Sequence, residues 1–344
     1  MYPRDLSVRP LTRPSQAAGL FLSSSIRLDH ALYVWRLARR PATTRVWRVD
    51  VICVRTLIGH KGAARAVVDV GGGRVASGGY DCTLRVWDVL SGTQLQQTPT
   101  GTGGIRCAIA LWGDRVATGH LDTGDIRLWS LCGGGRAAGE LRGHADSVFV
   151  LAVVSSGTAQ LLLASGSRDL SVRLWDVDAG ACHTVLAGEV TCLADLGCGR
   201  LLSGSEDGSL RVWNVDTGRI MLVVPNSHGE AYDGQQHVAI SAACALPSGG
   251  AATGSEGGIV LRWKWKEGCI ALAPDGAALQ LTGGVAALCT TAQGPDGALL
   301  LLASTTDGTI WVLREGPGGA LQEQSWHETE NAPNKLAAMM PAAQ

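Results

Sequence analysis

Short apolar runs separated by turn residues dominate the pattern of this chain. Between Gly143 and Asp176, an apolar run over residues 148–154 is followed by a second over residues 161–164. Clusters of Gly, Ser and Asp lie between and after these runs, and such clusters favour turns. Aliphatic and β-branched runs of this length, bounded by turn signals, are typical of strands. The stretch therefore predicts a series of strands joined by tight turns.

The same stretch recurs along the chain at fixed spacing. Six residues before a Trp there is an Asp, and ten residues before the Trp there is a small hydroxyl side chain. The Asp and Trp pairs are Asp29 and Trp35, Asp81 and Trp87, Asp169 and Trp175, and Asp207 and Trp213. The hydroxyl residues are Ser25, Ser77, Ser165, Ser203 and, before Trp263, Thr253. Residue types that recur at the same spacing before each Trp indicate one supersecondary unit used several times.

Three motifs in this unit resemble the WD-repeat β-propeller family. They are a leading Gly-His, as at Gly143-His144, a central Ser-Gly-x-x-Asp, and a closing Trp-Asp, as at Trp175-Asp176. Blades of that family are four-stranded antiparallel sheets of roughly 40–45 residues. The closing Trp positions here are 35, 87, 129, 175, 213 and 263, and Leu313 occupies a seventh slot. The resemblance implies an all-β fold, a single closed β-propeller of seven four-stranded antiparallel blades with irregular first and last blades.

Some repeats depart from the family pattern. The third carries Gly119-His120 at the Ser-Gly position instead of a Gly-His at its front. The fifth has Glu189 where the His is expected, and the sixth has Gly257 in place of the Asp. These repeats are expected to hold incomplete versions of the repeated motif.

The resemblance covers about residues 18–326, which we expect to form one propeller domain. Residues 1–17 contain three Pro and are expected to be an irregular N-terminal segment or a poorly matched first strand. The tail over residues 327–344 is polar and then Ala-rich, and is expected to be disordered or a short helix. The outer strand of the last blade is expected either from residues 320–326 or from a segment near the N-terminus that closes the ring.

The charge distribution limits the classes of partner. The net charge of −1 gives no reason to expect nucleic acid as a partner. Residues 1–57 nevertheless hold ten Arg and no Lys against three acidic residues. This segment could be a basic patch for phosphate or an acidic partner, a solvated Arg-rich edge, or a targeting sequence.

Hydropathy and cysteine usage favour an intracellular protein, cytoplasmic or nuclear. The longest apolar runs are six or seven residues, far below the ~20 that span a bilayer, so no membrane insertion is expected. The ten Cys contain no C-x-x-C pair, and most lie among apolar strand residues. Scattered thiols of this kind point to a reducing compartment.

Two repeats contain the residue types of a hydrolase triad, for example His144, Ser165 and Asp169. A catalytic site would occur once, whereas this set occurs in full twice and in part elsewhere. In the WD-repeat family these residues and the Trp form a buried hydrogen-bond network within each blade, so the resemblance implies a structural role. The residues expected in such networks are His60, Ser77, Asp81, Trp87, His144, Ser165, Asp169, Trp175, Ser203, Asp207 and Trp213.

No cofactor, metal site or small-molecule substrate is indicated by the sequence. The glycine-rich run over residues 101–104 lacks the Lys-Ser/Thr that follows in a phosphate-binding loop. The eight His are spread along the chain without an i, i+4 pair on a helix. We therefore expect a protein that is not an enzyme.

Docking of other proteins or peptides is the expected function. In the WD-repeat family, partners bind mainly on the narrower top face, which is built from the turns between second and third strands and the loops between blades. Matching positions place five residues there: Arg65, Tyr80, Phe149, Arg168 and Glu206. Tyr, Phe and Arg dominate binding hot spots, although each alone could be an ordinary exposed side chain.

The resemblance thus implies a non-catalytic protein–protein interaction scaffold. An alternative is the substrate-recognition subunit of a ubiquitin ligase complex, in which Arg65 and Arg168 would read acidic or phosphorylated peptides.

Overall fold

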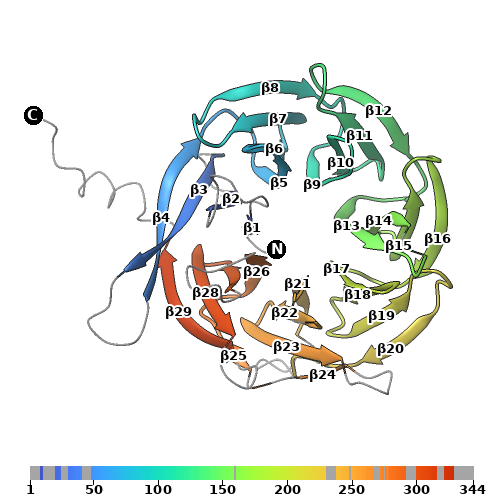
Figure 1. Cartoon of the computed structure of the whole chain (residues 1–344). Helices are drawn as coiled ribbons and strands as arrows, with labels where there is room; N and C mark the ends of the chain where they lie inside the picture. Colours follow the sequence, from blue (N-terminus) through green and yellow to red (C-terminus); the bar gives the residue numbers. More distant parts are fainter. Residues whose placement is uncertain are drawn as a thin grey trace, which may run out of the picture.

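The protein is an all-β propeller, as the repeats predict (Figure 1). The computed structural model describes residues 8–10, 20–24, 30–40, 48–158, 160–229, 238–247, 249–265, 272–274, 276, 278–291, 300–315 and 321–328. Within these ranges the strands form seven antiparallel sheets around a common axis. No helix occurs in them, and so none that is long and apolar enough to cross a membrane.

The first four sheets follow one another along the chain. The first contains β1 (Val8–Pro10), β2 (Leu20–Ser24), β3 (Leu32–Arg40) and β4 (Arg48–Leu57). The second contains β5 (Ala64–Gly71), β6 (Arg74–Gly79), β7 (Thr83–Asp88) and β8 (Gln94–Pro99). The third contains β9 (Ile105–Ala110), β10 (Arg115–His120), β11 (Ile126–Ser130) and β12 (Arg136–Leu141). The fourth contains β13 (Val148–Ser155), β14 (Leu161–Ser167), β15 (Ser171–Asp176) and β16 (Ala181–Ala187).

The remaining three sheets complete the ring. The fifth contains β17 (Cys192–Gly197), β18 (Arg200–Gly204), β19 (Leu210–Asn214) and β20 (Ile220–Val224). The sixth contains β21 (Ile240–Ala245), β22 (Ala251–Ser255), β23 (Ile259–Trp265), β24 (Leu272–Pro274) and β25 (Leu279–Gln280). The seventh contains β26 (Val285–Thr291), β27 (Leu300–Thr305), β28 (Thr309–Glu315) and β29 (Leu321–Glu328).

The hydrophobic core lies between neighbouring sheets. Side chains alternate between the two faces of each strand, so every sheet has an apolar face for each neighbour. Trp175 in the fourth sheet shares a core cluster with Leu128 and Leu141 of the third, and Trp87 in the second shares one with Leu57 of the first. The recurring Trp residues are thus the large side chains that join successive sheets.

The ring closes between the first and last sheets. Trp35 shares a core cluster with Leu302 and Val312, β4 contacts β29, and β1 contacts β26. Of the two sources considered for the outer strand of the last sheet, the structure shows the C-terminal one, because β29 pairs with β28. The N-terminal β1 instead pairs with β2, within the segment expected to be irregular or a poorly matched first strand. Ser25, Asp29 and the tail beyond residue 328 lie outside the described residues.

A β-bulge recurs in the innermost strands. In the second sheet Ala64 pairs with Gly79 and Ala66 with Gly78, so Arg65 is the extra residue. Arg106 in β9 and Phe149 in β13 occupy the same bulge position. Because a bulge redirects the side chain of its extra residue, these three side chains are set apart from the regular pleat.

Candidate functional site

The complete motif of the fourth sheet is a buried hydrogen-bond network. His144 precedes β13, and its Nε2 lies 2.7 Å from Ser165 Oγ while its Nδ1 lies 2.8 Å from Asp169 Oδ2. Trp175 Nε1 donates to Ser165 Oγ at 2.7 Å. The hydroxyl that a triad would use as nucleophile is therefore engaged by two partners, and Ser165 is fully buried, with 0% exposure.

The second sheet brings its four motif residues together in the same way. His60 lies 2.7 Å from Ser77 Oγ through Nε2 and 3.0 Å from Asp81 through Nδ1. Trp87 donates to Ser77 Oγ at 2.8 Å. The two networks have the same geometry. In each sheet, the network joins the loop before the innermost strand to the turn between the second and third strands and to the third strand, which carries the Trp.

The electrostatics of the network favour a neutral His and an ionised Asp. Burial lowers the pKa of His144, and Asp169 offsets that effect only in part. Burial raises the pKa of Asp169, but hydrogen bonds from Ser171, the Ala145 backbone N–H and His144 outweigh it and hold the pKa at about 2. The neutral imidazole can then donate from Nδ1 to the carboxylate and accept from the Ser hydroxyl at Nε2.

The fifth sheet holds only part of the network. Trp213 Nε1 donates to Ser203 Oγ at 2.9 Å, whereas Asp207 accepts from Ser209 and from Arg211, the latter at 2.6 Å. The described residues show no His that joins Ser203 to Asp207, because Glu189 stands in that position. Burial and the nearby carboxylates of Glu206 and Asp207 raise the pKa of Glu189.

Two network residues were missed by the sequence reasoning in the third sheet. Thr118 Oγ1 lies 2.9 Å from His120 Nε2 and accepts from Trp129 Nε1 at 2.8 Å. The extra residue in this repeat moves the hydroxyl from ten to eleven positions before the Trp. Counting back eleven residues from Trp129, instead of ten, would have identified Thr118.

His228 was missed in the sixth sheet. Its Nε2 lies 2.8 Å from Thr253 Oγ1, which also accepts from Trp263 Nε1 at 2.7 Å. His228 follows Ser227 instead of a Gly, which hides the motif. Its buried Nδ1 has no hydrogen-bond partner among the described residues, since Gly257 replaces the Asp found at this position in other sheets.

Replacing Gly257 with aspartate is expected to raise the free energy of unfolding by about 1 kcal/mol, because the carboxylate would accept from His228 Nδ1 and relieve an unsatisfied buried group. The new Cβ would lie 3.2 Å from Val238 Cγ1, so that methyl must shift slightly. Urea unfolding measures the change. Gly257→Ala is the matched control for the backbone, and equal stability of the two variants would contradict the expectation.

A row of Arg and aromatic side chains lies on what we define as the top face, which carries the turns between second and third strands and the loops that enter the innermost strands. Arg65 Cζ lies 5.1 Å from the centre of the Tyr80 ring, and Arg106 Cζ lies 5.9 Å from that of Phe149. Tyr80 is in the β6–β7 turn and is 41% exposed. Arg168, in the β14–β15 turn, is exposed beside the loop before β13, where its backbone N donates to Ser147 O at 3.0 Å. We call Arg65, Tyr80, Arg106, Phe149 and Arg168 the mouth row.

The structure pairs Arg65 with Tyr80, two of the five expected top-face residues, and pairs a third, Phe149, with Arg106, which was not expected. A fourth, Arg168, lies in the β14–β15 turn of the sheet that carries Phe149. The fifth, Glu206, is exposed in the β18–β19 turn of the next sheet. Arg106 was missed because its repeat lacks the leading Gly-His from which the position was counted. A different signal exists, since Arg65 and Arg106 each lie thirteen residues before the strand glycines Gly78 and Gly119.

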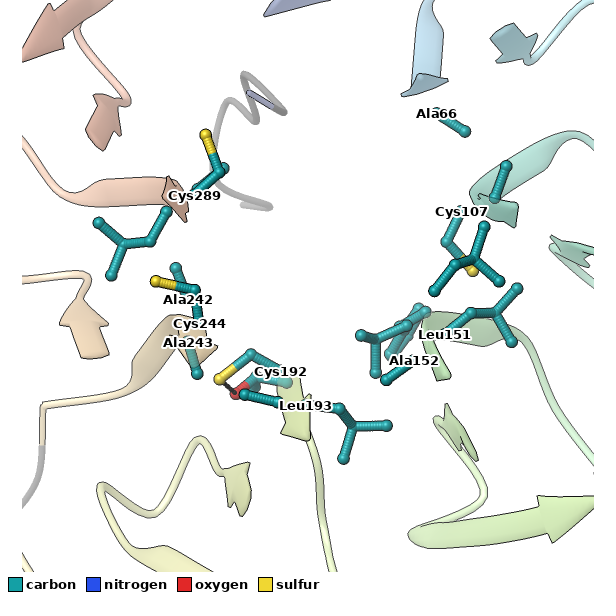
Figure 2. Close-up of a pocket in the computed structure, with 18 of the residues that line it drawn as sticks. Ala66, Cys107, Leu151, Ala152, Cys192, Leu193, Ala242, Ala243, Cys244 and Cys289 are labelled. Atoms are coloured by element: carbon teal, nitrogen blue, oxygen red, sulfur yellow. Dashed lines mark hydrogen bonds between the residues drawn. The ribbon is translucent and has the colours of Figure 1, made fainter. Parts of the chain in front are cut away.

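The mouth row stands at the end of a cavity along the propeller axis. This cavity has a volume of about 540 Å³ and is lined by the innermost strands, with Arg65, Arg106 and Phe149 among its residues. Figure 2 shows its walls, where small and apolar side chains alternate with the thiols of Cys107, Cys192, Cys244 and Cys289. Burial raises the pKa of Cys192 and of Cys244 to about 12. Both thiols therefore remain protonated.

Metal binding finds no support in the described residues, which contain no group of three His, Cys, Asp or Glu side chains suited to hold an ion.

A ring of antiparallel sheets with repeated hydroxyl–Trp hydrogen bonds and recurrent His partners defines the class of WD-repeat β-propellers. Residues 51–88, 135–176 and 180–214 match the family model described as WD domain, G-beta repeat. The resemblance drawn from the sequence is thereby confirmed.

Relatives share only part of their length with this chain. Nuclear distribution protein PAC1 of Arthroderma otae is 31% identical over 131 residues, which cover 36% of this chain and 28% of that protein. Autophagy-related protein 16 of Arabidopsis thaliana is 26% identical over 136 residues, covering 39% of this chain and 26% of that protein. The matches thus span less than a third of these relatives.

Two solved structures share the fold over most of the chain. The structure of U3-55K has a TM-score of 0.68 at 20% identity and covers 88% of this chain and 93% of that chain. The crystal structure of RRP9 WD40 repeats has a TM-score of 0.68 at 19% identity, covering 88% and 92%. At this identity the likeness concerns the fold alone.

Proposed function

We propose that this protein is a non-catalytic scaffold that docks other proteins or peptides on its top face, with its seven sheets acting as seven blades. The observation that carries the proposal is the mouth row, in which bulges and turns of a rigid ring present two guanidinium–aromatic pairs at 5.1 and 5.9 Å. Arg and Tyr dominate protein-binding hot spots. Rigid sheets that fix variable loops suit such a role.

The geometry of the His–Ser–Asp sets supports a non-catalytic role. Ser77 and Ser165 are both fully buried, at 0% exposure, and each accepts a hydrogen bond from a Trp. A nucleophile must reach its substrate and be activated by a base. These hydroxyls instead stabilise the turns that display the top face.

We also place the protein inside the cell, in the cytoplasm or nucleus. The Cys residues in the described part of the chain form no disulfide bonds. Free thiols persist in reducing compartments.

The docking role is tested by affinity capture from cell extract with the full chain. We expect Tyr80→Ala with Arg168→Ala to reduce recovery of at least one protein tenfold or more, because both side chains are exposed on the top face. Arg136→Ala with Arg219→Ala is the control, since both Arg are exposed beside the turns into β12 and β20, on the opposite face. Identical recovery with both double variants would refute docking on the top face.

The composition of the captured set also separates the two functions considered. Ubiquitin ligase subunits that are lost with Arg168→Ala would favour a substrate-recognition subunit. A set without them would favour a general scaffold.

A further inference from the structure

We propose that the exposed side chain of Leu170 is an anchor residue of the top face, which inserts into an apolar socket on a partner protein. This inference rests on the proposed docking function and assigns a contact residue and a kind of partner surface to it. Leu170 ends the β14–β15 turn, and its C=O accepts from the N–H of Gly188, which directly follows the outermost strand β16. It therefore lies towards the rim of the top face.

The turn between the second and third strands has the same form in five sheets. The backbone N–H of its fourth residue donates to the C=O of its first, as Leu170 does to Ser167 at 3.3 Å. The fourth residue has a φ between 55° and 91° in each of them, a region that glycine adopts without steric cost and other residues do not. The residues at this position are Cys82, Leu170, Gly208, Gly258 and Gly308. A leucine thus occupies a position at which three of the five sheets have glycine.

Leu170 is 57% exposed although the backbone holds it at a steric cost. At the equivalent position the side chain of Cys82 is only partly exposed and donates to Tyr80 O of its own turn at 3.7 Å. Leu90, on the opposite face, is 50% exposed but lies outside the positive-φ region. Leu170 therefore combines a strained backbone with an exposed apolar side chain, and neither property stabilises the isolated propeller. Burial of the side chain against a partner would offset the cost.

The groups around Leu170 indicate the kind of surface that it fits. Gly188, which donates to Leu170 O at 2.9 Å, is followed by Glu189. Glu206 interacts with Glu189, and both Glu206 and Arg168 are exposed. A single apolar side chain among charged groups matches a small apolar socket with a polar rim, the arrangement found at binding hot spots. The two carboxylates disfavour an anionic membrane surface, so the expected partner is a folded protein.

Replacing Leu170 with glycine should stabilise the isolated propeller, because the change relieves the backbone and removes an exposed apolar side chain. We expect Leu170→Gly to have a higher urea unfolding midpoint than wild type and than Leu170→Ala, which shortens the side chain but keeps the backbone cost. Cys82→Gly is the matched control, since it relieves the same turn position in the second sheet. Far-UV circular dichroism follows the unfolding of the full chain.

Photo-crosslinking identifies what contacts Leu170. A photoreactive leucine analogue is placed at position 170 of the full chain, which is irradiated in cell extract, and crosslinked proteins are identified by mass spectrometry. The same analogue at position 90 is the control, because Leu90 is similarly exposed, at 50%, in the β7–β8 turn of the opposite face. We expect at least one protein that is crosslinked from position 170 and not from position 90.

Capture of that protein from extract then separates the side chain from the backbone. We expect Leu170→Gly and Leu170→Ala to reduce its recovery by about fivefold or more, although Leu170→Gly is the more stable protein. Leu170→Met keeps a long apolar side chain, and Cys82→Gly relieves only the second sheet. Both variants should keep recovery within about twofold of wild type.

The inference is overturned if position 170 crosslinks no protein, the same proteins as position 90, or only a second copy of this chain. It is also overturned if Leu170→Gly recovers the crosslinked protein as well as wild type does, or if Leu170→Gly is no more stable than Leu170→Ala. If recovery of cellular proteins depends on Tyr80 and Arg168 but not on Leu170, the anchor is wrong and the docking face stands. If recovery depends on none of the three, docking on the top face is wrong as well.

Discussion

Replacing Trp175 with alanine is expected to lower the free energy of unfolding by about 3–5 kcal/mol. Trp175 is 1% exposed and belongs to the core cluster that joins the third and fourth sheets, with Leu128, Leu141 and Val148 among its members. Its removal leaves a cavity at this junction and deprives Ser165 Oγ of its Trp donor. Urea unfolding followed by far-UV circular dichroism measures the loss.

Two further variants separate packing from hydrogen bonding at Trp175. Trp175→Phe keeps most of the ring volume but removes the indole N–H, so we expect a loss of about 1–2 kcal/mol. Trp112→Ala is the control, because Trp112 is only partly buried at the edge of the same core cluster, with its ring centre 5.4 Å from Arg115 Cζ. If Trp112→Ala were as destabilising as Trp175→Ala, the Trp between sheets would have no special role.

Most of the fold was predictable because the residues that define each repeat lie close together in the sequence at nearly constant spacing. The spacing between Ser165, Asp169 and Trp175 follows from hairpin geometry, in which Leu163 pairs with Trp175 and Ser167 with Ser171. That spacing survives wherever the turn keeps its length. One extra residue in the third repeat was enough to hide Thr118.

Other features depend on contacts that no local pattern encodes. The three-residue strand β1 is too short to give an alternating signal, and it is positioned by β2 and β26. The outer strand of the last sheet could not be chosen from sequence, because ring closure joins segments hundreds of residues apart. β29 occupies that position in the structure.

The candidate site was predictable only where its repeat was regular. Arg65 and Phe149 lie five residues after the motif His60 and His144, so the family pattern located them. Arg106 has the same bulge geometry but no His at the front of its repeat. The pairing of Arg65 with Tyr80 and of Arg106 with Phe149 required coordinates, since each pair joins side chains on different elements.

The networks link the top face to the stability of the sheets. Asp169 accepts from the Ala145 backbone N–H at 3.0 Å and from His144 at 2.8 Å, so it joins the β14–β15 turn to the loop before β13. Arg168 and Phe149 flank these two segments. A change in the protonation of the His would therefore loosen the elements that carry the mouth row.

Lowering the pH from about 6.5 to about 4 is expected to destabilise the propeller by roughly 3 kcal/mol through His228 alone. Burial lowers the pKa of His228 to about 4, so between these pH values the unfolded chain binds a proton that the folded protein does not. The stabilisation is complete above the unfolded pKa and is lost as the pH falls through this window. His60, His120 and His144 also have pKa values lowered by burial and act in the same direction.

Urea unfolding at a series of pH values measures this loss, and His228→Gln should flatten the profile between about pH 6.5 and 4. The same replacement at the exposed His183 is the control and should leave the slope unchanged. A wild-type slope in the His228→Gln variant would contradict the assignment.

Gly257→Asp provides an independent check, because a carboxylate beside His228 Nδ1 favours the protonated imidazole. That variant should lose less stability on acidification than Gly257→Ala, because the carboxylate brings the folded-state pKa of His228 closer to its unfolded value.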